Sequence, residues 1–425
     1  MKRFMGQAGF VGMSHLGLVY AAAALAKGCR VCCFDDDRDL IARLRSLDLP
    51  IHEPGILEVM AANKSRIKFT ADWSDLVGLD LVFLALDVAT DGAGVKDLSA
   101  LDHLTESLRS RVGNEAKIVL LSQVPPGYSR DKFQRGLIDY YQVETLVFGE
   151  ALDRASNPER FIVGTPNEKA LDPVLVDFLS QWECPTYTML FESAELAKIS
   201  INIFLAASVT ATNTLASLCE RNGADWASIR PAVSADKRIG PYAYLKPGLG
   251  ISGGNIERDI RSLSDDLRGF GLDSSFVDAI ATHSRYRKDW LIEKVAVAFK
   301  EGYLGKVGVL GLTYKPDTLS LKNSPSIRLL MAFPERNFVV YDPMAKATGL
   351  ENVEEARDVD EVFMVCDVVV VATPWPVFRE FDWQSVFGSK LQTKHIIDPF
   401  GVCPRELVSR AGMGSKYCQL GARNG

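Results

Sequence analysis

The stretch Gly12-Met13-Ser14-His15-Leu16-Gly17 decides the fold. It opens an apolar helical pattern that extends to Lys27, and a predicted strand over residues 30–34 follows and ends at Asp35. A glycine turn, a helix, a strand and an acid in this order are typical of a dinucleotide-binding βαβ unit. The alternative at this point is a glycine-containing turn that binds no ligand.

Each position of the turn has a physical role in this interpretation. Gly12 makes the tight turn, and Gly17 lets the helix pack closely on the strand. The amides at the start of the helix, around His15 and Leu16, face the pyrophosphate. Ser14 replaces the middle glycine and adds a side chain where the backbone normally touches phosphate. We assign all five residues to the cofactor site, and we expect the His15 side chain to be structural.

The acidic residues that follow the predicted strand, beginning with Asp35, indicate which dinucleotide the turn binds. Asp35 follows Gly12 by 23 residues, close to the spacing at which a carboxylate meets the adenosine ribose hydroxyls. The acidic run 35–37 would repel a 2′-phosphate, so we predict NAD rather than NADP.

The rest of the chain predicts a three-part α/β protein. Strands are expected over 79–86, 117–121 and 145–148 with a helix over 98–108, and the pattern restarts with strands over 307–310, 338–341, 367–371 and 395–397. Long helical stretches, 193–221 and 275–299, separate the two halves. We therefore expect an N-terminal Rossmann-like NAD domain (1–190), a central helical connector (191–300) and a C-terminal Rossmann-like domain (301–425).

Composition excludes several other classes. The 425 residues carry a net charge of -6, so no basic excess favours a nucleic acid or an anionic membrane. The longest apolar run, Leu16 to Ala26, has 11 residues, against the roughly 20 that a spanning helix needs. No signal peptide is apparent. The eight cysteines form no paired metal box, and we expect a reduced cytoplasmic protein without a metal site.

Several motifs then occur in an order that resembles the UDP-glucose/GDP-mannose dehydrogenase family over nearly the whole chain. They are Pro50-Ile51-His52-Glu53-Pro54-Gly55, Asp97-Leu98-Ser99, Ser122-Gln123-Val124-Pro125-Pro126-Gly127-Tyr128, Glu195 through Lys198 to Asn202, Arg238-Ile239-Gly240, Pro247 to Asp259, Gly311-Leu312-Thr313-Tyr314-Lys315-Pro316, and Tyr341-Asp342-Pro343. No single motif is specific, but eight in order are.

The resemblance implies a function. Members of the family oxidise the C6 alcohol of a nucleotide sugar to a carboxylate, using two NAD per sugar and a thioester on a cysteine. It also implies that the central helix supports a homodimer, that the C-terminal domain binds the nucleotide, and that a UDP-sugar is the favoured substrate.

Two departures fall on the residues of the second oxidation. The catalytic cysteine of the family aligns with Asn255, and no cysteine lies between Cys219 and Cys366. The catalytic glutamate aligns with Arg154, beside a deletion, or is lost altogether. An amide cannot form the thioester, because that step requires a thiolate.

The residues for alcohol oxidation survive in part. Lys198 and Asn202 lie four apart on one predicted helix and so share a face, where they can polarise an alkoxide. Asp259 is a candidate base or water-orienting group. With Asn255, these form the predicted catalytic set. The resemblance adds Ser122 for the cofactor and, for the substrate, Arg238 across a dimer interface together with Gly248, Gly250, Gly253, Tyr314 and Lys315.

Three functions stay open. The first is an NAD-dependent nucleotide-sugar dehydrogenase that performs one two-electron oxidation, with acid formation through an aldehyde hydrate, independent of cysteine, as a variant. The second is a non-catalytic protein that binds NAD or a nucleotide sugar, favoured by the loss of both the cysteine and the glutamate. The third is a 3-hydroxyacid dehydrogenase with a related helical core, which leaves the C-terminal α/β part unexplained.

Overall fold

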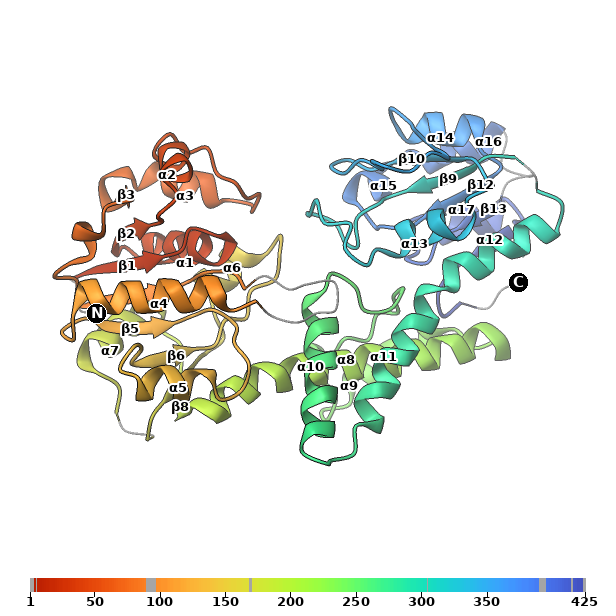
Figure 1. The fold of residues 1–425 in the computed structure, drawn as a ribbon. Coiled ribbons are helices and arrows are strands. Elements are labelled where there is room, and N and C mark those ends of the chain that lie inside the picture. Colours follow the sequence, from red (N-terminus) through yellow and green to blue (C-terminus); the bar gives the residue numbers. More distant parts are fainter. Residues whose placement is uncertain are drawn as a thin grey trace. The chain divides into compact units, whose positions relative to one another are not determined.

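A computed structural model describes residues 4, 6–88, 97–167, 170–303, 305–389, 395–413 and 416–422. The chain divides into two compact units, Met1–Ser200 and Ile201–Gly425. Figure 1 shows one sheet in each unit, with helix α8 (Phe191–Asn222) carrying the chain from the first unit into the second. The division into three domains remains a proposal.

The first unit is built on an eight-stranded sheet in the order β3-β2-β1-β4-β5-β6-β7-β8. Its strands are β1 (Gln7–Val11), β2 (Arg30–Phe34), β3 (Ile67–Thr70), β4 (Leu81–Leu84), β5 (Lys117–Leu120), β6 (Tyr140–Gln142), β7 (Phe161–Thr165) and β8 (Thr186–Leu190). All neighbouring pairs are parallel except β6 and β7. The order reverses between β1 and β4, which creates the crevice where doubly wound sheets bind ligands.

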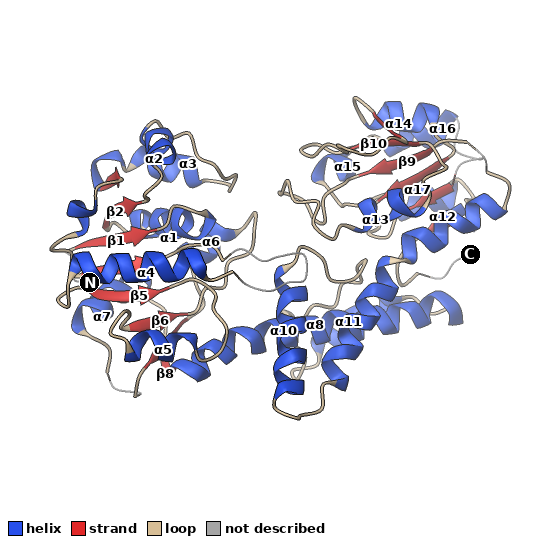
Figure 2. Cartoon of the chain, viewed as in Figure 1, coloured by secondary structure: helices blue, strands red, loops and turns tan. Residues whose placement is uncertain are grey.

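The connections of this sheet place helices on both faces. From β1 the chain proceeds one way to β2 and β3, and from β4 it proceeds the other way to β5 and β6, so right-handed crossovers put the two sets of helices on opposite faces. The helices are α1 (His15–Ala26), α2 (Arg38–Arg45), α3 (Ile56–Ala62), α4 (Ser99–Val112), α5 (Tyr128–Gln134), α6 (Ala151–Ser156) and α7 (Pro173–Leu179), as coloured in Figure 2.

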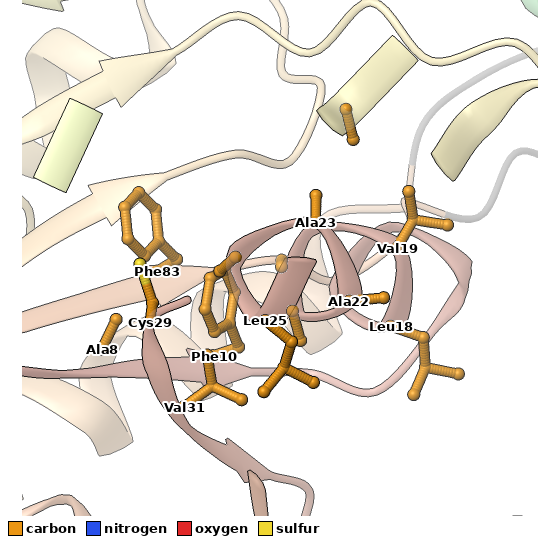
Figure 3. Close-up of a cluster of buried hydrophobic side chains, with 14 of the residues drawn as sticks. Ala8, Phe10, Leu18, Val19, Ala22, Ala23, Leu25, Cys29, Val31 and Phe83 are labelled. Carbon is orange, nitrogen blue, oxygen red and sulfur yellow. The ribbon is translucent and has the colours of Figure 1, made fainter. Parts of the chain in front are cut away.

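The core of this unit is formed around α1. Nine of the twelve residues of α1 are buried. Leu18, Ala22 and Leu25 belong to the same hydrophobic cluster as the strand residues Phe10 and Val31 (Figure 3). The small alanines let the helix approach the sheet closely, and every buried side chain removes apolar surface from water. Cys29 and Cys32 are buried in this unit, and burial raises the pKa of Cys32 to about 11.

The second unit holds a parallel six-stranded sheet in the order β11-β10-β9-β12-β13-β14. Its strands are β9 (Val307–Leu310), β10 (Phe338–Tyr341), β11 (Val353–Glu355), β12 (Val368–Val371), β13 (His395–Ile397) and β14 (Tyr417–Cys418). The helices around it are α12 (Trp290–Lys300), α13 (Pro325–Ala332), α14 (Val359–Val365), α15 (Pro376–Glu380), α16 (Trp383–Ser389) and α17 (Arg405–Arg410). The order 3-2-1-4-5-6 is that of the Rossmann fold, so the predicted fold class is confirmed for both sheets.

Three further helices pack on the second half of α8. They are α9 (Trp226–Ala235), α10 (Asn255–Gly269) and α11 (Ser275–Lys288). Ile260 of α10 and Val277 and Ile280 of α11 form a small core with Ala206 of α8. This core fixes α10, which begins at Asn255 and carries Asp259 one turn later.

Helix α8 is long and apolar, although it contains no long unbroken run of apolar residues. The 21 residues from Ile199 to Cys219 contain no charged side chain, because serines, threonines and asparagines interrupt the aliphatic residues. An 18-residue window reaches a mean hydropathy of 1.4, and 33% of it is buried, so by length and composition alone this helix is long enough to cross a membrane. A core helix of a water-soluble protein meets the same criterion.

Two predicted elements are wrong. Residues 145–148 do not form a strand, since the strand beside β5 is the earlier β6 and the later segment leads into α6. The expected helix over 275–299 is two helices, α11 and α12, that meet at Asp289. The first error arises because apolar content alone does not distinguish a strand from a loop, and the second because the helical pattern continues across the break at Asp289.

We predict that Gly17→Ala destabilises the first unit. A Cβ atom at this position would lie 1.9 Å from the carbonyl oxygen of Gly12, so the turn or α1 must shift. Overpacking of this kind costs about 1–3 kcal/mol of unfolding free energy, measurable by urea denaturation. The matched control is Gly269→Ala, where the added Cβ meets nothing within 4 Å. Equal stability of the two variants would contradict this account.

Candidate functional site

The predicted dinucleotide turn has the backbone geometry that the sequence required. Gly12 follows β1 with φ +94°, a conformation that favours glycine, and its amide donates to the carbonyl of Phe34 at 2.9 Å. The next amide, that of Met13, donates to Oδ2 of Asp35 at 2.8 Å. These two bonds hold the turn against the carboxyl end of β2.

Asp35 therefore lies where the sequence placed it. Its Oδ1 accepts from the amide of Asp37 at 3.0 Å, and burial raises the pKa of its carboxyl group. Asp37 faces the other way and caps α2 by accepting from the amides of Asp39 and Leu40. The turn, the helix amides and this carboxylate fit the adenosine half of NAD.

Ser14 and Ser122 join the strand ends that border the crevice. Ser14 Oγ donates to the carbonyl of Ala85 at 3.1 Å and accepts from the amide of Asp87 at 2.9 Å. Ser122 Oγ donates to the carbonyl of Leu86 at 2.6 Å. Both predicted cofactor residues thus fix the segment after β4, which lies beside the turn.

Asp87 is a residue that the sequence analysis missed. Its Oδ2 accepts from the amide of Leu16 at 3.2 Å, one of the α1 amides expected to face the pyrophosphate. A carboxylate at a helix N-terminus is favourable in itself, because it meets the positive end of the helix dipole. The Asp87 carboxylate also places a negative charge at the expected position of the pyrophosphate of NAD, which is itself negatively charged.

His15 is structural, as the sequence predicted. Its Nε2 lies 2.7 Å from Oε1 of Glu53, and its ring packs on Phe148. The buried Glu53 carboxylate also accepts from the amides of Gly149 and Ala151. Glu53 therefore connects the dinucleotide turn to the start of α6, a role for the predicted Pro-Ile-x-Glu-Pro-Gly segment that only the structure reveals.

Helix α8 carries two of the predicted catalytic residues one turn apart. Lys198 is 8% exposed, and its Nζ lies 2.8 Å from Oε1 of Glu144. One turn earlier, the buried Glu195 accepts from the amides of Gly127 and Ser129. Burial raises the pKa of Glu195. The two contacts anchor the first half of α8 to the loops that follow β5 and β6.

Asn202 of α8 is hydrogen-bonded to Asp259 of α10. The Asn202 Nδ2 donates to Oδ2 of Asp259 at 2.6 Å, and both side chains are buried. The other oxygen, Oδ1, lies 3.3 Å from Nε of Arg258. Asn255 is exposed at the first position of α10, so Asp259 lies one helical turn beyond it. The structure thus brings together two of the predicted catalytic residues, Asn202 and Asp259.

The glycine-rich segment before α10 is held at both ends. The amide of Gly248 donates to Oδ1 of Asn213 at 2.9 Å, and the amide of Ile251 donates to Oγ of Ser284 at 2.8 Å. Gly253 has φ +91°, and a Cβ there would lie 2.6 Å from the ring of Tyr314. Gly250 likewise leaves no room for a Cβ, which would lie 2.5 Å from the carbonyl oxygen of Ser284.

The segment after β9 brings the remaining substrate candidates against these glycines. Tyr314 contacts Gly253 as described, and Lys315 is the next residue and half-buried. The turn repeats the geometry of the first sheet, because the amide of Gly311 donates to the carbonyl of Tyr341 and the amide of Leu312 donates to Oδ2 of Asp342 at 2.7 Å.

Arg238 is the candidate that stays apart from the others. Its side chain is 89% exposed and pairs with Asp236, two residues away. Its predicted role, contact with substrate across a dimer interface, therefore remains a proposal.

Three family models match the chain in order. The NAD binding domain of the UDP-glucose/GDP-mannose dehydrogenase family matches residues 7–176, the central domain 192–285 and the UDP binding domain 308–405. The last match accounts for the C-terminal α/β part, which the 3-hydroxyacid dehydrogenase alternative does not. The NAD prediction is confirmed at the level of the domain.

Whole-chain relatives agree. A UDP-glucose 6-dehydrogenase of Rickettsia bellii is 27% identical over 97% of this chain and 99% of its own. A UDP-glucose dehydrogenase structure from Pyrobaculum islandicum aligns with a TM-score of 0.84 and 25% identity, covering 95% of this chain and 96% of the other. A UDP-D-ManNAc dehydrogenase structure from Pyrococcus horikoshii has the same fold, with a TM-score of 0.82, 21% identity and coverage of 99% and 100%.

We predict that Asp87→Asn tightens NAD binding. Removing the carboxylate from the start of α1 removes its repulsion with the pyrophosphate, a gain of about 0.3–1 kcal/mol or roughly two- to fivefold in Kd. Titration calorimetry at low salt measures this change. Asp80→Asn, at the opposite end of β4, removes the same charge and should leave Kd unchanged. Weaker binding by Asp87→Asn would contradict the prediction.

Proposed function

Because the chain belongs to the UDP-glucose/GDP-mannose dehydrogenase family, we propose that it oxidises the C6 alcohol of a UDP-sugar with NAD in a single two-electron step. Members of this family are NAD-dependent nucleotide-sugar dehydrogenases. The proposal concerns the number of oxidations and the nucleotide.

Asn255 carries the proposal of a single oxidation. It occupies the start of α10, where the family resemblance places the thiol. The two cysteines that flank this region in sequence, Cys219 and Cys366, are both buried. An amide does not add to an aldehyde to hold it as a covalent acyl intermediate, so the aldehyde is the expected product.

The residues for the first oxidation form a coherent set. The alcohol passes its proton to Asp259 or to a water that Asp259 orients, and the ammonium of Lys198 and an N–H of Asn202 stabilise the alkoxide oxygen that forms. Asn202 Nδ2 carries two hydrogens, and Asp259 accepts one of them, which fixes the amide and leaves the other for substrate. NAD, held by the turn at Gly12 and by Asp35, would supply the acceptor for the hydride of C6, so that the alcohol would leave as an aldehyde.

The nucleotide is assigned to the second unit. The match of residues 308–405 to a UDP binding domain supports a UDP-sugar. Lys315 supplies a positive charge for a phosphate, and the tightly held glycines at 250 and 253 let backbone amides approach the ligand. A homodimer in which Arg238 reaches the partner's substrate, and a cytoplasmic location, complete the proposal.

One set of observations favours a second function, a non-catalytic NAD or nucleotide-sugar binding protein. The thiol and the glutamate of the family are both replaced in this chain. In addition, Asp87 accepts a hydrogen bond from the amide of Leu16, one of the amides expected to face the pyrophosphate. The buried Asn202–Asp259 pair argues for the enzyme, because a binding protein has no need to keep an amide oriented at this place.

The experiment is NADH formation with a panel of UDP-, GDP-, dTDP- and ADP-sugars. We expect absorbance at the NADH band with a UDP-sugar, and a loss of about a hundredfold or more in Lys198→Met, because the alkoxide loses its charged partner. Lys300→Met, on the exposed end of α12, is the control. NAD binding without NADH from any sugar would select the non-catalytic function, and turnover of GDP-sugars alone would overturn the nucleotide assignment.

We also predict that Asn255→Cys becomes acylated and stalls. A thiolate at the start of α10 is stabilised by the helix dipole and adds to the aldehyde, and a second hydride transfer gives a thioester. With Arg154 in place of the family glutamate, hydrolysis should be slow. Intact-mass spectrometry should find the sugar acyl adduct at one per chain. Asn255→Ser is the control, and an unmodified Asn255→Cys protein would contradict the prediction.

A further inference from the structure

Lys198, the predicted catalytic lysine, forms a largely buried ion pair with Glu144. The Nζ and Oε1 atoms are 2.8 Å apart, and the side chains are 10% and 15% exposed. At this degree of burial the pair is weakly screened by salt, so the position of the ammonium depends strongly on the carboxylate.

Glu144 is itself held in place. Its Oε2 accepts from the amide of Leu146 at 2.9 Å, which closes the loop between β6 and α6 around the carboxylate. Nε of Arg154 donates to the carbonyl of Thr145 at 3.0 Å, and Glu53 holds the amide of Gly149. The loop is therefore tied at three points, and Glu144 presents a fixed oxygen to the lysine.

The neighbouring charge has changed sign relative to the family. The resemblance aligns Arg154 with the catalytic glutamate, so α6 presents a cation where an acid is expected. Glu144 and Arg154 act on one common neighbour, Tyr20: burial is the main cause that raises the pKa of its phenol, Glu144 raises it further, and Arg154 lowers it. The carboxylate of Glu144 is thus present near Arg154, but it lies on the loop between β6 and α6 and not on α6 itself.

We infer that Glu144 is the positioning residue for Lys198, orienting its ammonium toward the substrate oxygen in place of the carboxylate lost at position 154. The inference rests on the proposed function of Lys198 in alcohol oxidation. An ammonium has three N–H donors, so one bond to Glu144 fixes the head group and still leaves donors for an alkoxide. Glu144 itself touches no reacting atom.

The test compares kcat and KM of Glu144→Gln with those of the wild type. Loss of a charge-assisted hydrogen bond should lower kcat about ten- to a hundredfold, while KM for the sugar and Kd for NAD change less than about threefold. Glu144→Asp should recover part of kcat. The double variant Glu144→Gln/Arg154→Glu, which returns the carboxylate to α6, should also recover part of it.

Glu159→Gln is the matched control. Glu159 is an exposed glutamate from the same neighbourhood, and it pairs with Arg154 and not with Lys198. It should leave kcat unchanged. Unchanged kcat in Glu144→Gln would overturn the inference. A parallel fall of kcat, NAD affinity and thermal stability in that variant would also overturn it, because it would indicate a merely structural role.

A readout without turnover separates this inference from the proposed function. Labelling of Lys198 by an amine-directed reagent, followed by peptide mass spectrometry, should be faster in Glu144→Gln than in Glu159→Gln, since the lysine loses its carboxylate partner. Equal labelling rates would overturn the contact itself. If the wild type forms no NADH while labelling still depends on Glu144, the ion pair stands and the catalytic assignment fails.

Discussion

The structure depends on one kind of contact, the hydrogen bond from the backbone amide after the turn glycine to the side-chain carboxylate that follows the second strand. In the first sheet it joins Met13 to Asp35 at 2.8 Å, and in the second it joins Leu312 to Asp342 at 2.7 Å. In both, the preceding glycine has a positive φ, +94° and +95°, and donates to the last carbonyl of the neighbouring strand. The same local solution therefore builds both crevices.

The two contacts differ in how their carboxylates are used. Asp35 is half-buried at the mouth of the dinucleotide turn and accepts from the amides of Met13 and Asp37. Asp342 is buried and accepts in addition from the amides of Met344 and Ala345 and from Nε1 of Trp375, so it is fully occupied within the protein. The acid of the first turn is thus partly exposed and that of the second is buried, which agrees with an NAD domain and a nucleotide domain that recognises its ligand through other residues.

The sequence predicted what local pattern and spacing determine. The turn, β2, the acid at its end, the long helix α8 and most strands of the second sheet follow from periodicity and glycine placement. The strand expected over 145–148 was wrong, since apolar content alone does not distinguish a strand from a loop that packs inward. Glu53, Glu144 and Asp87 escaped prediction because their partners lie 38, 54 and 71 residues away in sequence, and only folding brings them together.

The central claim is that replacement of the thiol by Asn255 limits the enzyme to one oxidation. The most direct measurement is the ratio of NADH formed to UDP-sugar consumed in single-enzyme reactions, with the product mass read in parallel. The account predicts one NADH per sugar and a product two mass units lighter than the substrate, the aldehyde. Two NADH per sugar with a uronic acid product would contradict it, and would mean that acid forms by a route that needs no cysteine.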